Sequence, residues 1–308
     1  MAVSIVIPLY NKEAYIKNTL SKVFRQTYQD FEVVIVDDGS TDSSASVVKE
    51  FDDPRIRLFS QENQGASAAR NNGCRQARYE HIAFLDADDE WDENYLLKMQ
   101  QLIDRYPDAV LYGSNYYITE SGETTVLSYP DVAEGMSVIE DFFVSSKVYT
   151  PIWTSAAIVK REAFLEENGF PLSCKVCEDI DLWCRLAARG QVAYINEPLA
   201  NYRRDAANSL SRSTDTTMYF PFLDIYDKLI SRTDVRYPSV CEYVTYKKVF
   251  AASFCLRNAN KRDAKRIMQG IENPGNYKKK LLVYKILAHC PQTIIDGIYS
   301  LVINNKEK

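Results

Sequence analysis

Long hydrophobic runs are missing from this chain of 308 residues, and none reaches the roughly 18 apolar residues that a membrane-spanning helix needs. The N-terminus, MAVSIVIPLY, resembles a strand and lacks a basic leader or cleavage site, so we expect no signal peptide. Internal repeats and low-complexity segments are absent too. These absences favour a globular protein of the cytoplasm.

Cysteine is present without the organisation of a disulfide framework, because its seven residues are odd in number and irregularly spaced. Cys174 and Cys177 form a Cys-x-x-Cys pair. It does not lie at the first strand–helix turn, where a redox motif would be expected, and no second ligand pair for zinc accompanies it. The simplest interpretation is that the thiols stay reduced in a cytoplasm.

Positive charge is scarce along most of the chain and gathers near its end. The net charge of −5 argues against a nucleic-acid partner. Residues 1–213 carry 21 basic and 33 acidic side chains (net −12), and residues 214–256 carry 5 of each. Residues 257–308 carry 11 basic and 4 acidic side chains (net +7). We therefore expect two regions, a domain at 1–213 and a different C-terminal part at 214–308.

Strand and helix patterns alternate along the first 113 residues. Apolar, β-branched runs predict strands at 3–8, 31–36, 56–59, 81–85 and 108–113, and helical spacing predicts helices from Asn11 onward and at 45–51, 65–77 and 93–106. This alternation is typical of an α/β fold with a mostly parallel sheet covered on both faces. Ligands of such sheets bind at the carboxyl ends of the strands. Four polar clusters should meet there: Pro8–Asn11, Asp37–Ser40, Asn63–Gly65 and Asp86–Asp89.

The second half of the chain changes character. A hairpin around Ser121-Gly122, a strand at 155–160 and a helix at 179–189 are predicted first. Beyond Thr214 only helices follow, at 218–231, 240–259, 263–271, 278–289 and 293–303.

The run Phe84-Leu85-Asp86-Ala87-Asp88-Asp89 places three carboxylates directly after a buried strand. Such a concentration of negative charge is costly unless a cation neutralises it. Mg²⁺ and Mn²⁺ take carboxylate oxygens and leave positions for substrate phosphates. The alternative is a solvated acidic turn that caps the following helix.

Five segments, taken in order, carry a resemblance to a known family: VSIVIPLYN at 3–11, FEVVIVDDGSTD at 31–42, NQGASAARNNG at 63–73, HIAFLDADDEW at 81–91 and CEDIDLWCRLAARG at 177–190. The chain resembles the family 2 glycosyltransferases, an inverting group with the GT-A fold, over roughly its first 210 residues. The resemblance implies a Rossmann-like, mostly parallel sheet flanked by helices, with a helical C-terminal extension. It also implies a nucleotide-sugar donor, a divalent metal and direct displacement at the anomeric carbon.

The resemblance implies roles for the residues of the donor site. Asp86 and Asp88 match the DXD pair, with Ala87 between them and Asp89 as an adjacent metal ligand in some members. Asp38 matches the carboxylate that accepts a hydrogen bond from uracil, although Asp37 and Asp38 also suit a tight turn before the helix. The remaining residues implied are Pro8 and Tyr10 in the base pocket, and Arg70 beside phosphate or Asp88, unless Arg70 is only a surface residue.

On the acceptor side, Asp179 matches the family's general base. Its place at a helix N-terminus should keep it ionised through the helix dipole, but Glu178 or Asp179 could also be a simple helix cap. Glu178, Trp183 and Arg185 are candidates for acceptor contact or support, with Trp183 either stacking on a sugar or filling the core.

The sequence departs from the family pattern at two points, one at the metal site and one that bears on the kind of transfer. A histidine usual after the Tyr-Arg segment is replaced in Tyr202-Arg203-Arg204-Asp205, and neither His81 nor His289 fits that role. Either Asp205 substitutes or no third protein ligand exists. The Q-x-x-R-W motif of processive synthases is absent, which favours the addition of a single sugar.

The C-terminal region has two interpretations. Basic segments at Arg257–Arg266 and Lys278–Lys280 lie beside apolar stripes, which suits an interfacial helix on anionic lipid at the inner face of the plasma membrane. A lipid-linked or glycan acceptor would agree with that position. The alternative is a helical cap on the catalytic domain or a homodimer interface.

The preferred hypothesis is thus a metal-dependent inverting glycosyltransferase that uses a UDP-sugar in cell-surface polysaccharide synthesis. A sugar nucleotidyltransferase would need a Gly-rich loop with Arg and Lys after the first strand, where this chain has PLYNKE. A non-catalytic sugar-nucleotide-binding protein would be expected to lack Asp88 or Asp179, and both are present.

Overall fold

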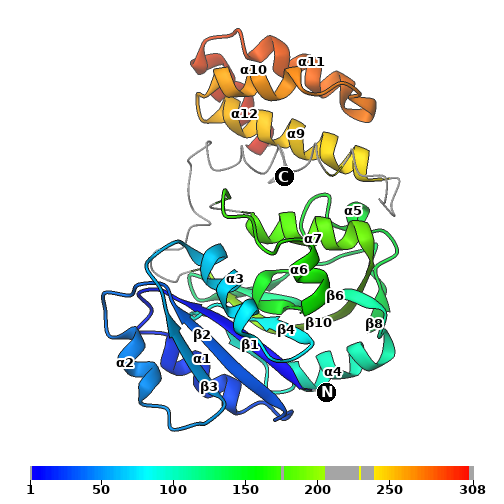
Figure 1. The fold of residues 1–308 in the computed structure, drawn as a ribbon. Helices are drawn as coiled ribbons and strands as arrows, with labels where there is room; N and C mark the ends of the chain where they lie inside the picture. Colours follow the sequence, from blue (N-terminus) through cyan, green and yellow to red (C-terminus); the bar gives the residue numbers. More distant parts are fainter. Residues whose placement is uncertain (1, 175–176, 205–228, 230–238, 305–308) are drawn as a thin grey trace. The chain divides into compact units, whose positions relative to one another are not determined.

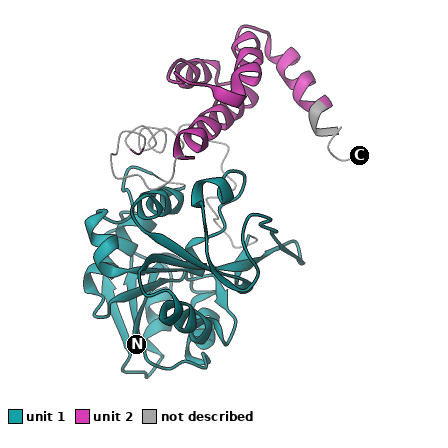
Figure 2. Ribbon diagram, turned by 90° about the vertical axis from the view of Figure 1, so that its right-hand side faces the viewer, with its two compact units in different colours: residues 1–211 teal, residues 212–308 magenta. Residues whose placement is uncertain are grey.

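The computed structural model describes residues 2–174, 177–204, 229 and 239–304 (Figure 1). The chain divides into two compact units, residues 1–211 and residues 212–308 (Figure 2). The substitute ligand Asp205 lies outside the described residues, as does the helix predicted at 218–231 apart from residue 229. All seven cysteines are free thiols, and within the described ranges no helix is long and apolar enough to cross a bilayer.

Unit 1 is built on one mixed sheet with the order β3-β2-β1-β4-β9-β6-β10-β5. The strands β1 (Val3–Leu9), β2 (Phe31–Asp37), β3 (Ile56–Ser60) and β4 (His81–Phe84) pair in parallel, as predicted. β1 and β2 are buried on both faces or nearly so, which explains their continuous apolar sequence. The remaining strands are β5 (Glu90–Trp91), β6 (Ala109–Glu120), β7 (Glu123–Val126), β8 (Met136–Val138), β9 (Ala157–Lys160) and β10 (Gln191–Arg203).

Helices cover both faces of this sheet. α1 (Ile16–Phe24) and α4 (Tyr95–Arg105) pack on the face formed by Ile5, Ile7 and Ile35. α3 (Ala66–Gln76) lies on the opposite face, where a Cβ at Gly73 would sit 2.5 Å from Val6. Glycine therefore permits the close approach that fixes α3 against β1. The other helices of the unit are α2 (Ser44–Lys49), α5 (Phe142–Ser145), α6 (Arg161–Glu166) and α7 (Glu178–Arg189).

Two details of the sheet were not predicted, and one prediction about a helix start is wrong. The strand predicted at 108–113 is not a direct neighbour of β4, because β9 inserts between them and runs antiparallel to both. β10, which pairs in parallel with β6, was not predicted. Asn11 does not cap the first helix, since α1 begins at Ile16 and Asn11 has a left-handed backbone with φ of 50°. Its side chain instead accepts a hydrogen bond from the backbone N of Thr41 at 2.8 Å. The hairpin at Ser121-Gly122 is confirmed by the pairing of β6 with β7.

Unit 2 is helical in its described part. Its elements are α9 (Val240–Arg257), α10 (Lys261–Gln269), α11 (Lys278–Leu287) and α12 (Gln292–Asn304). α9 is the central helix, and each of the other three packs against it. On α11 the side chains of Leu281, Tyr284 and Leu287 are buried, whereas Leu282, Val283 and Ile286 are exposed. This helix thus presents one apolar face to the unit's core and part of another to its surface.

Candidate active site

The acidic segment Asp86–Asp89 follows β4 at the carboxyl edge of the sheet, as predicted from the sequence. Ser155 holds this segment in shape, because its Oγ accepts from the backbone N of Asp86 at 3.0 Å and donates to Oδ2 of Asp89 at 2.7 Å. The antiparallel direction of β9 makes this contact possible. Residues that precede β9 lie beside the end of β4.

Asp86 is joined to the N-terminus of α7 by a single buried guanidinium. Arg70 of α3 donates to Oδ1 of Asp86 at 2.6 Å and to Oε1 of Glu178 at 2.8 Å. Burial disfavours the charge on Arg70, but Asp86 and then Glu178 outweigh it and raise the Arg70 pKa. The predicted pairing of Arg70 with Asp88 is replaced by pairing with Asp86. Arg70 thus links the two acidic motifs of the site, and it is not a surface arginine.

Asp88 is paired with a residue from the first loop of the chain. The Nζ of Lys12 lies 2.7 Å from Oδ2 of Asp88, and the two side chains are 18% and 16% exposed. The backbone N of Lys12 is held at 2.7 Å by Oγ of Ser44, at the start of α2. Lys12 follows directly after the predicted cluster Pro8–Asn11, so the first loop of the chain and the acidic loop are in direct contact.

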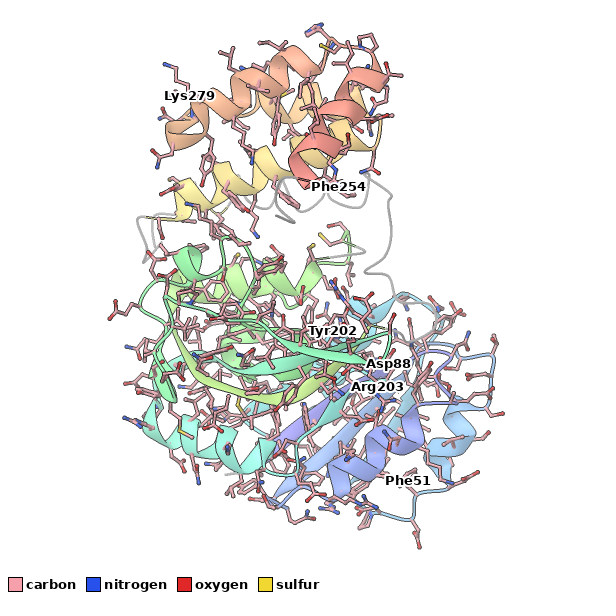
Figure 3. All side chains as sticks on the ribbon, turned by 180° about the vertical axis from the view of Figure 1, so that it is seen from behind. Phe51, Asp88, Tyr202, Arg203, Phe254 and Lys279 are labelled. Carbon is pink, nitrogen blue, oxygen red and sulfur yellow. The ribbon has the colours of Figure 1, made fainter. Side chains whose placement is uncertain are left out.

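Asp89 lies deeper than its two neighbours and is 2% exposed. Its second oxygen accepts from the backbone N of Arg203 at 3.3 Å, at the end of β10 (Figure 3). Burial, followed by the charges of Asp88 and Asp86, raises the pKa of Asp89 well above its usual value. These contacts assign Asp89 to holding the acidic loop on β10 and Ser155, which differs from the adjacent-ligand role implied by the resemblance.

Asp179 occupies the first turn of α7 next to Glu178. Thr154 donates to its Oδ2 at 3.0 Å, and the backbone N of Ile180 lies 2.8 Å from its Oδ1. Burial and the neighbouring charge of Glu178 raise the Asp179 pKa to about 6. The helix dipole does not lower the Asp179 pKa below its usual value, because desolvation and the like charge of Glu178 outweigh it, but the carboxylate is still mostly ionised at neutral pH. A pKa near neutrality suits a general base.

Asp38 is 2% exposed and already accepts three hydrogen bonds. They come from Nε2 of Gln61 at 2.8 Å, the backbone N of Gln64 at 2.9 Å and the backbone N of Gly65 at 2.7 Å. Asp37 shapes the turn by accepting from the backbone N of Ser40 at 3.0 Å. Asp38 therefore organises the loop between β3 and α3, and a base ligand would have to share its remaining acceptor capacity.

The other predicted residues fall into two groups. Tyr10 is 46% exposed and Pro8 is partly buried, so both border the sheet edge, while Ala87 is buried and its carbonyl accepts from Thr19. Trp183 is fully buried and packs against Phe84 and Phe170, which makes it a core residue and not a sugar platform. Arg185 pairs with Asp181 and donates to the carbonyl of Gly169, so it braces α7.

Three residues at this site were not predicted from the sequence: Lys12, Thr154 and Ser155. The only signal for Lys12 was its position in the loop after β1, directly after the predicted cluster Pro8–Asn11. Thr154 and Ser155 could be found only by knowing that β9 is antiparallel. A hydroxyl pair in front of a short apolar strand carries no such information by itself.

The site fits a divalent cation only in part. In the described ranges no three His, Cys, Asp or Glu side chains are grouped to hold a metal ion. Asp86 is engaged by Arg70, and Asp89 by Ser155 and Arg203. Asp88 is the one of the three whose ion-pair partner is a lysine. Mg²⁺ is often bound by one or two carboxylates, substrate phosphates and water, so these residues fit a site completed by a donor diphosphate.

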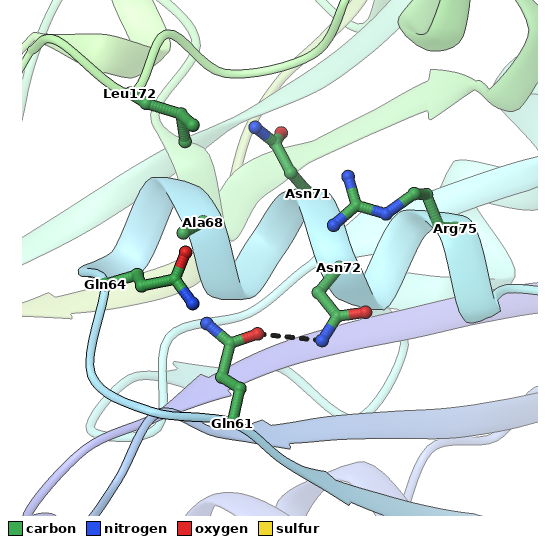
Figure 4. Close-up of a pocket in the computed structure, with 7 residues that line it drawn as sticks. All are labelled: Gln61, Gln64, Ala68, Asn71, Asn72, Arg75 and Leu172. Atoms are coloured by element: carbon green, nitrogen blue, oxygen red, sulfur yellow. Dashed lines mark hydrogen bonds between the residues drawn. The ribbon is translucent and has the colours of Figure 1, made fainter.

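A cavity of about 260 Å³ lies along α3 (Figure 4). Its polar lining includes Gln61, Asn72 and Arg75, and Nδ2 of Asn72 donates to Oε1 of Gln61 at 2.7 Å. None of the carboxylates described above lines it. Its volume is below the range typical of ligand pockets, so we assign the chemistry to the acidic edge.

The sequence is similar to known glycosyltransferases. Residues 4–166 match the family model described as Glycosyl transferase family 2. Glycosyltransferase GlyG of Streptococcus pneumoniae is 27% identical over 242 residues, covering 74% of this chain and 79% of GlyG. Putative glycosyltransferase EpsH of Bacillus subtilis is 30% identical over 224 residues, covering 68% of this chain and 63% of EpsH. The chain spans only 41% of a longer relative, glycosyltransferase GlyA of S. pneumoniae, at 27% identity.

Solved structures show the same fold. TarS 1-349 of S. aureus in complex with UDP-GlcNAc superposes with a TM-score of 0.73 at 16% identity, covering 98% of this chain and 92% of TarS 1-349. The mannosyltransferase PcManGT of Pyrobaculum calidifontis, in complex with GDP-Man and Mn²⁺, gives a TM-score of 0.58 at 19% identity, covering 98% of this chain and 84% of that one. The mixed sheet flanked by helices is thus the GT-A architecture predicted from the sequence.

Proposed function

The chain belongs to glycosyl transferase family 2, and from this premise we propose that it moves one sugar from a nucleotide-sugar, preferably a UDP-sugar, to a glycan or lipid-linked acceptor in cell-surface polysaccharide synthesis. Residues 1–213 would bind the donor and carry out the transfer. The two alternatives, a sugar nucleotidyltransferase and a non-catalytic binding protein, gain no support from the site.

One observation carries the proposal. Arg70 joins Asp86 of the acidic loop to Glu178, the residue before Asp179. Two groups of carboxylates with different tasks are thereby held at one sheet edge: one that suits a diphosphate with its cation, and one that suits proton transfer. A protein that only binds a nucleotide has no use for the second group.

The chemistry follows from this arrangement. Asp179 takes the proton of the acceptor hydroxyl while that oxygen forms a bond to the anomeric carbon from the side opposite the diphosphate. The bond from the anomeric carbon to the diphosphate breaks, and its electron pair stays on the phosphate oxygen. Mg²⁺ or Mn²⁺ bound at Asp88, with Asp86 nearby, would supply Lewis-acid stabilisation of that oxygen. Inversion of the anomeric centre is the expected outcome.

Several residues support donor selection. Pro8, Tyr10 and Asp38 border the place where the base would lie, at the ends of β1 and β2.

Two aromatic residues could contact the acceptor. The ring centroids of Trp153 and Tyr202 lie 4.6 Å apart, and Trp153 precedes Thr154, which donates a hydrogen bond to Asp179. Both aromatic rings are only partly buried, which suits contact with a sugar face.

Unit 2 supports a place of action at a membrane surface. α11 carries four lysines at 278–280 and 285 and no acidic residue, and its exposed side includes Leu282, Val283 and Ile286. Basic and apolar groups on one exposed side suit peripheral binding to anionic lipid, here at the inner face of the plasma membrane. A homodimer interface on the same surface is the alternative.

Donor binding, which the proposed transfer requires, is tested with a panel of nucleotide-sugars, each scored for thermal stabilisation with Mn²⁺ and with a chelator. A ligand that binds the folded state raises its midpoint by mass action. We expect UDP-sugars with Mn²⁺ to give the largest shift. The absence of any shift across UDP-, GDP- and other nucleotide-sugars, with and without metal, would contradict the proposal.

A further inference from the structure

The acidic loop of the ligand-free protein is neutralised by cations that belong to the chain itself. Asp86 is paired with Arg70 at 2.6 Å, and Asp88 is paired with Lys12 at 2.7 Å. Asp89 accepts its hydrogen bonds from Ser155 and the backbone of Arg203. The two outer carboxylates thus each have a positive partner before any ligand arrives.

The two cationic partners differ in how firmly they are held. Arg70 is 5% exposed, forms ion pairs with both Asp86 and Glu178, and lies on the rigid helix α3. Lys12 is 18% exposed and reaches Asp88 at the end of a flexible four-carbon stem. Its backbone is fixed, because its N is bonded to Ser44 and its carbonyl accepts from Tyr15 and Ile16. The stem of Lys12 can therefore change its conformation while its backbone stays in place.

A divalent ion bound to Asp88 would repel the Lys12 ammonium that lies 2.7 Å from Oδ2 of the same carboxylate, because two cations at this distance repel each other. We propose that Lys12 is the cation which a divalent ion displaces from Asp88, and that the freed ammonium then contacts the diphosphate of the donor. Lys12 is therefore a positioning residue that keeps the acidic loop neutral and folded until donor and cation arrive. The second half of this inference rests on the proposed donor function, whereas the first half does not.

The test uses the full chain and two separate titrations. The first measures Mn²⁺ binding alone, by electron paramagnetic resonance of free Mn²⁺, to the wild type and to Lys12→Met. Because the competing ammonium is gone, Lys12→Met should bind Mn²⁺ about tenfold more tightly, which corresponds to about 1.4 kcal/mol of binding free energy. The second measures UDP affinity by calorimetry at saturating Mn²⁺. Here Lys12→Met should bind about tenfold more weakly, because a charged phosphate contact is lost.

The opposite signs of the two effects identify the role. A variant that is merely damaged would bind both ligands more weakly, and its thermal midpoint would show the damage. Lys12→Arg keeps the charge and should bind Mn²⁺ like the wild type. Lys17→Met removes a lysine of the same loop-and-helix segment that is 71% exposed and only 3.9 Å from Glu50, and should change neither titration.

Equal or weaker Mn²⁺ binding by Lys12→Met would overturn the proposal, as would the absence of Mn²⁺ binding by both proteins. Tighter Mn²⁺ binding by Lys12→Met, without UDP binding by any variant, would leave the competition at Asp88 in place. It would contradict the contact between Lys12 and the diphosphate, together with the donor function.

Discussion

Unit 1 and unit 2 use charge in opposite ways. The acidic loop of unit 1 lies at a sheet edge. Asp86 and Asp88 are each paired there with a cationic side chain, and hydrogen bonds hold Asp89. In unit 2, the helix α11 exposes lysines beside exposed leucine, valine and isoleucine side chains. Paired and partly buried charge suits chemistry on one small ligand, whereas exposed charge beside apolar groups suits a broad surface. The comparison supports the proposal that unit 1 carries out the reaction and that unit 2 determines where it takes place.

The largest effect is expected from a substitution that removes only the proposed proton transfer in unit 1. Asp179→Asn should lower transfer by about 10²-fold or more, because the amide cannot take the acceptor proton. The amide oxygen can still accept from one of the two donors, Thr154 or the backbone N of Ile180, so the variant should fold and bind UDP. Transfer is measured with the donor found in the nucleotide-sugar panel. Glu162→Gln, in the first turn of α6, is the matched control and should retain full activity. Wild-type turnover by Asp179→Asn would remove it as the base.

The second prediction concerns the pH dependence of transfer. The Asp179 pKa is raised to about 6, and a base must be ionised. The rate should therefore fall as the pH drops through about 6, approaching about tenfold per pH unit below it. The hydrogen bond from Thr154 lowers the Asp179 pKa, so Thr154→Val should move this limb to higher pH, and Thr154→Ser should leave it in place. A rate that is flat between pH 5 and pH 7 (about one unit either side of the limb) would contradict the assignment.

The third prediction separates two roles of Asp38. Asp38→Asn should lower the thermal midpoint without ligand, because one of its three donors from residues 61–65 would face an amide NH₂. It should also reduce the preference for UDP over ADP, measured by calorimetry. Asp37→Asn keeps an oxygen for the backbone N of Ser40 and is the control for both readouts. Equal affinity of the wild type for UDP and ADP would argue against a uracil-selective pocket.

The smallest expected effect concerns unit 2. Binding of the full chain to anionic vesicles should weaken with salt, and Lys279→Gln or Ile286→Ser should each lower it several-fold, with about 1 kcal/mol per basic residue near the surface. Val148→Ser removes an apolar side chain of unit 1 that is 63% exposed and should leave sedimentation with vesicles unchanged. Vesicle binding that does not depend on the charge of the lipid would favour a packing or dimer interface for α11.

The sequence predicted much of the fold, because strands buried on both faces have a continuous apolar signature that needs no partner to be recognised. β1 and β2 are such strands, and the acidic segment was correctly placed after β4. The direction of β9 could not be predicted, since a four-residue apolar run looks the same in a parallel and an antiparallel neighbour. The positions of Thr154 and Ser155 depended on that direction.

Contacts between residues far apart in the sequence could not be predicted either. Lys12 and Asp88 are 76 residues apart, and a lone lysine in a loop gives no sign of the carboxylate it will meet. The amphipathic pattern of α7 fits Trp183 either in the core or at a ligand, and only its packing on Phe84 decided between them. Whether Asp38 faces solvent or its own chain depended in the same way on the path of residues 61–65.

The most direct test of the account is UDP binding to the full chain by calorimetry, with Mn²⁺ and with a chelator, for the wild type and Asp88→Asn. The account predicts that Mn²⁺ strengthens UDP binding by about tenfold or more in the wild type, because the cation joins Asp88 to the diphosphate. Asp88→Asn should bind UDP weakly and equally under both conditions. Equal UDP affinity with and without metal in the wild type would contradict the assignment of the acidic edge as a metal-dependent donor site.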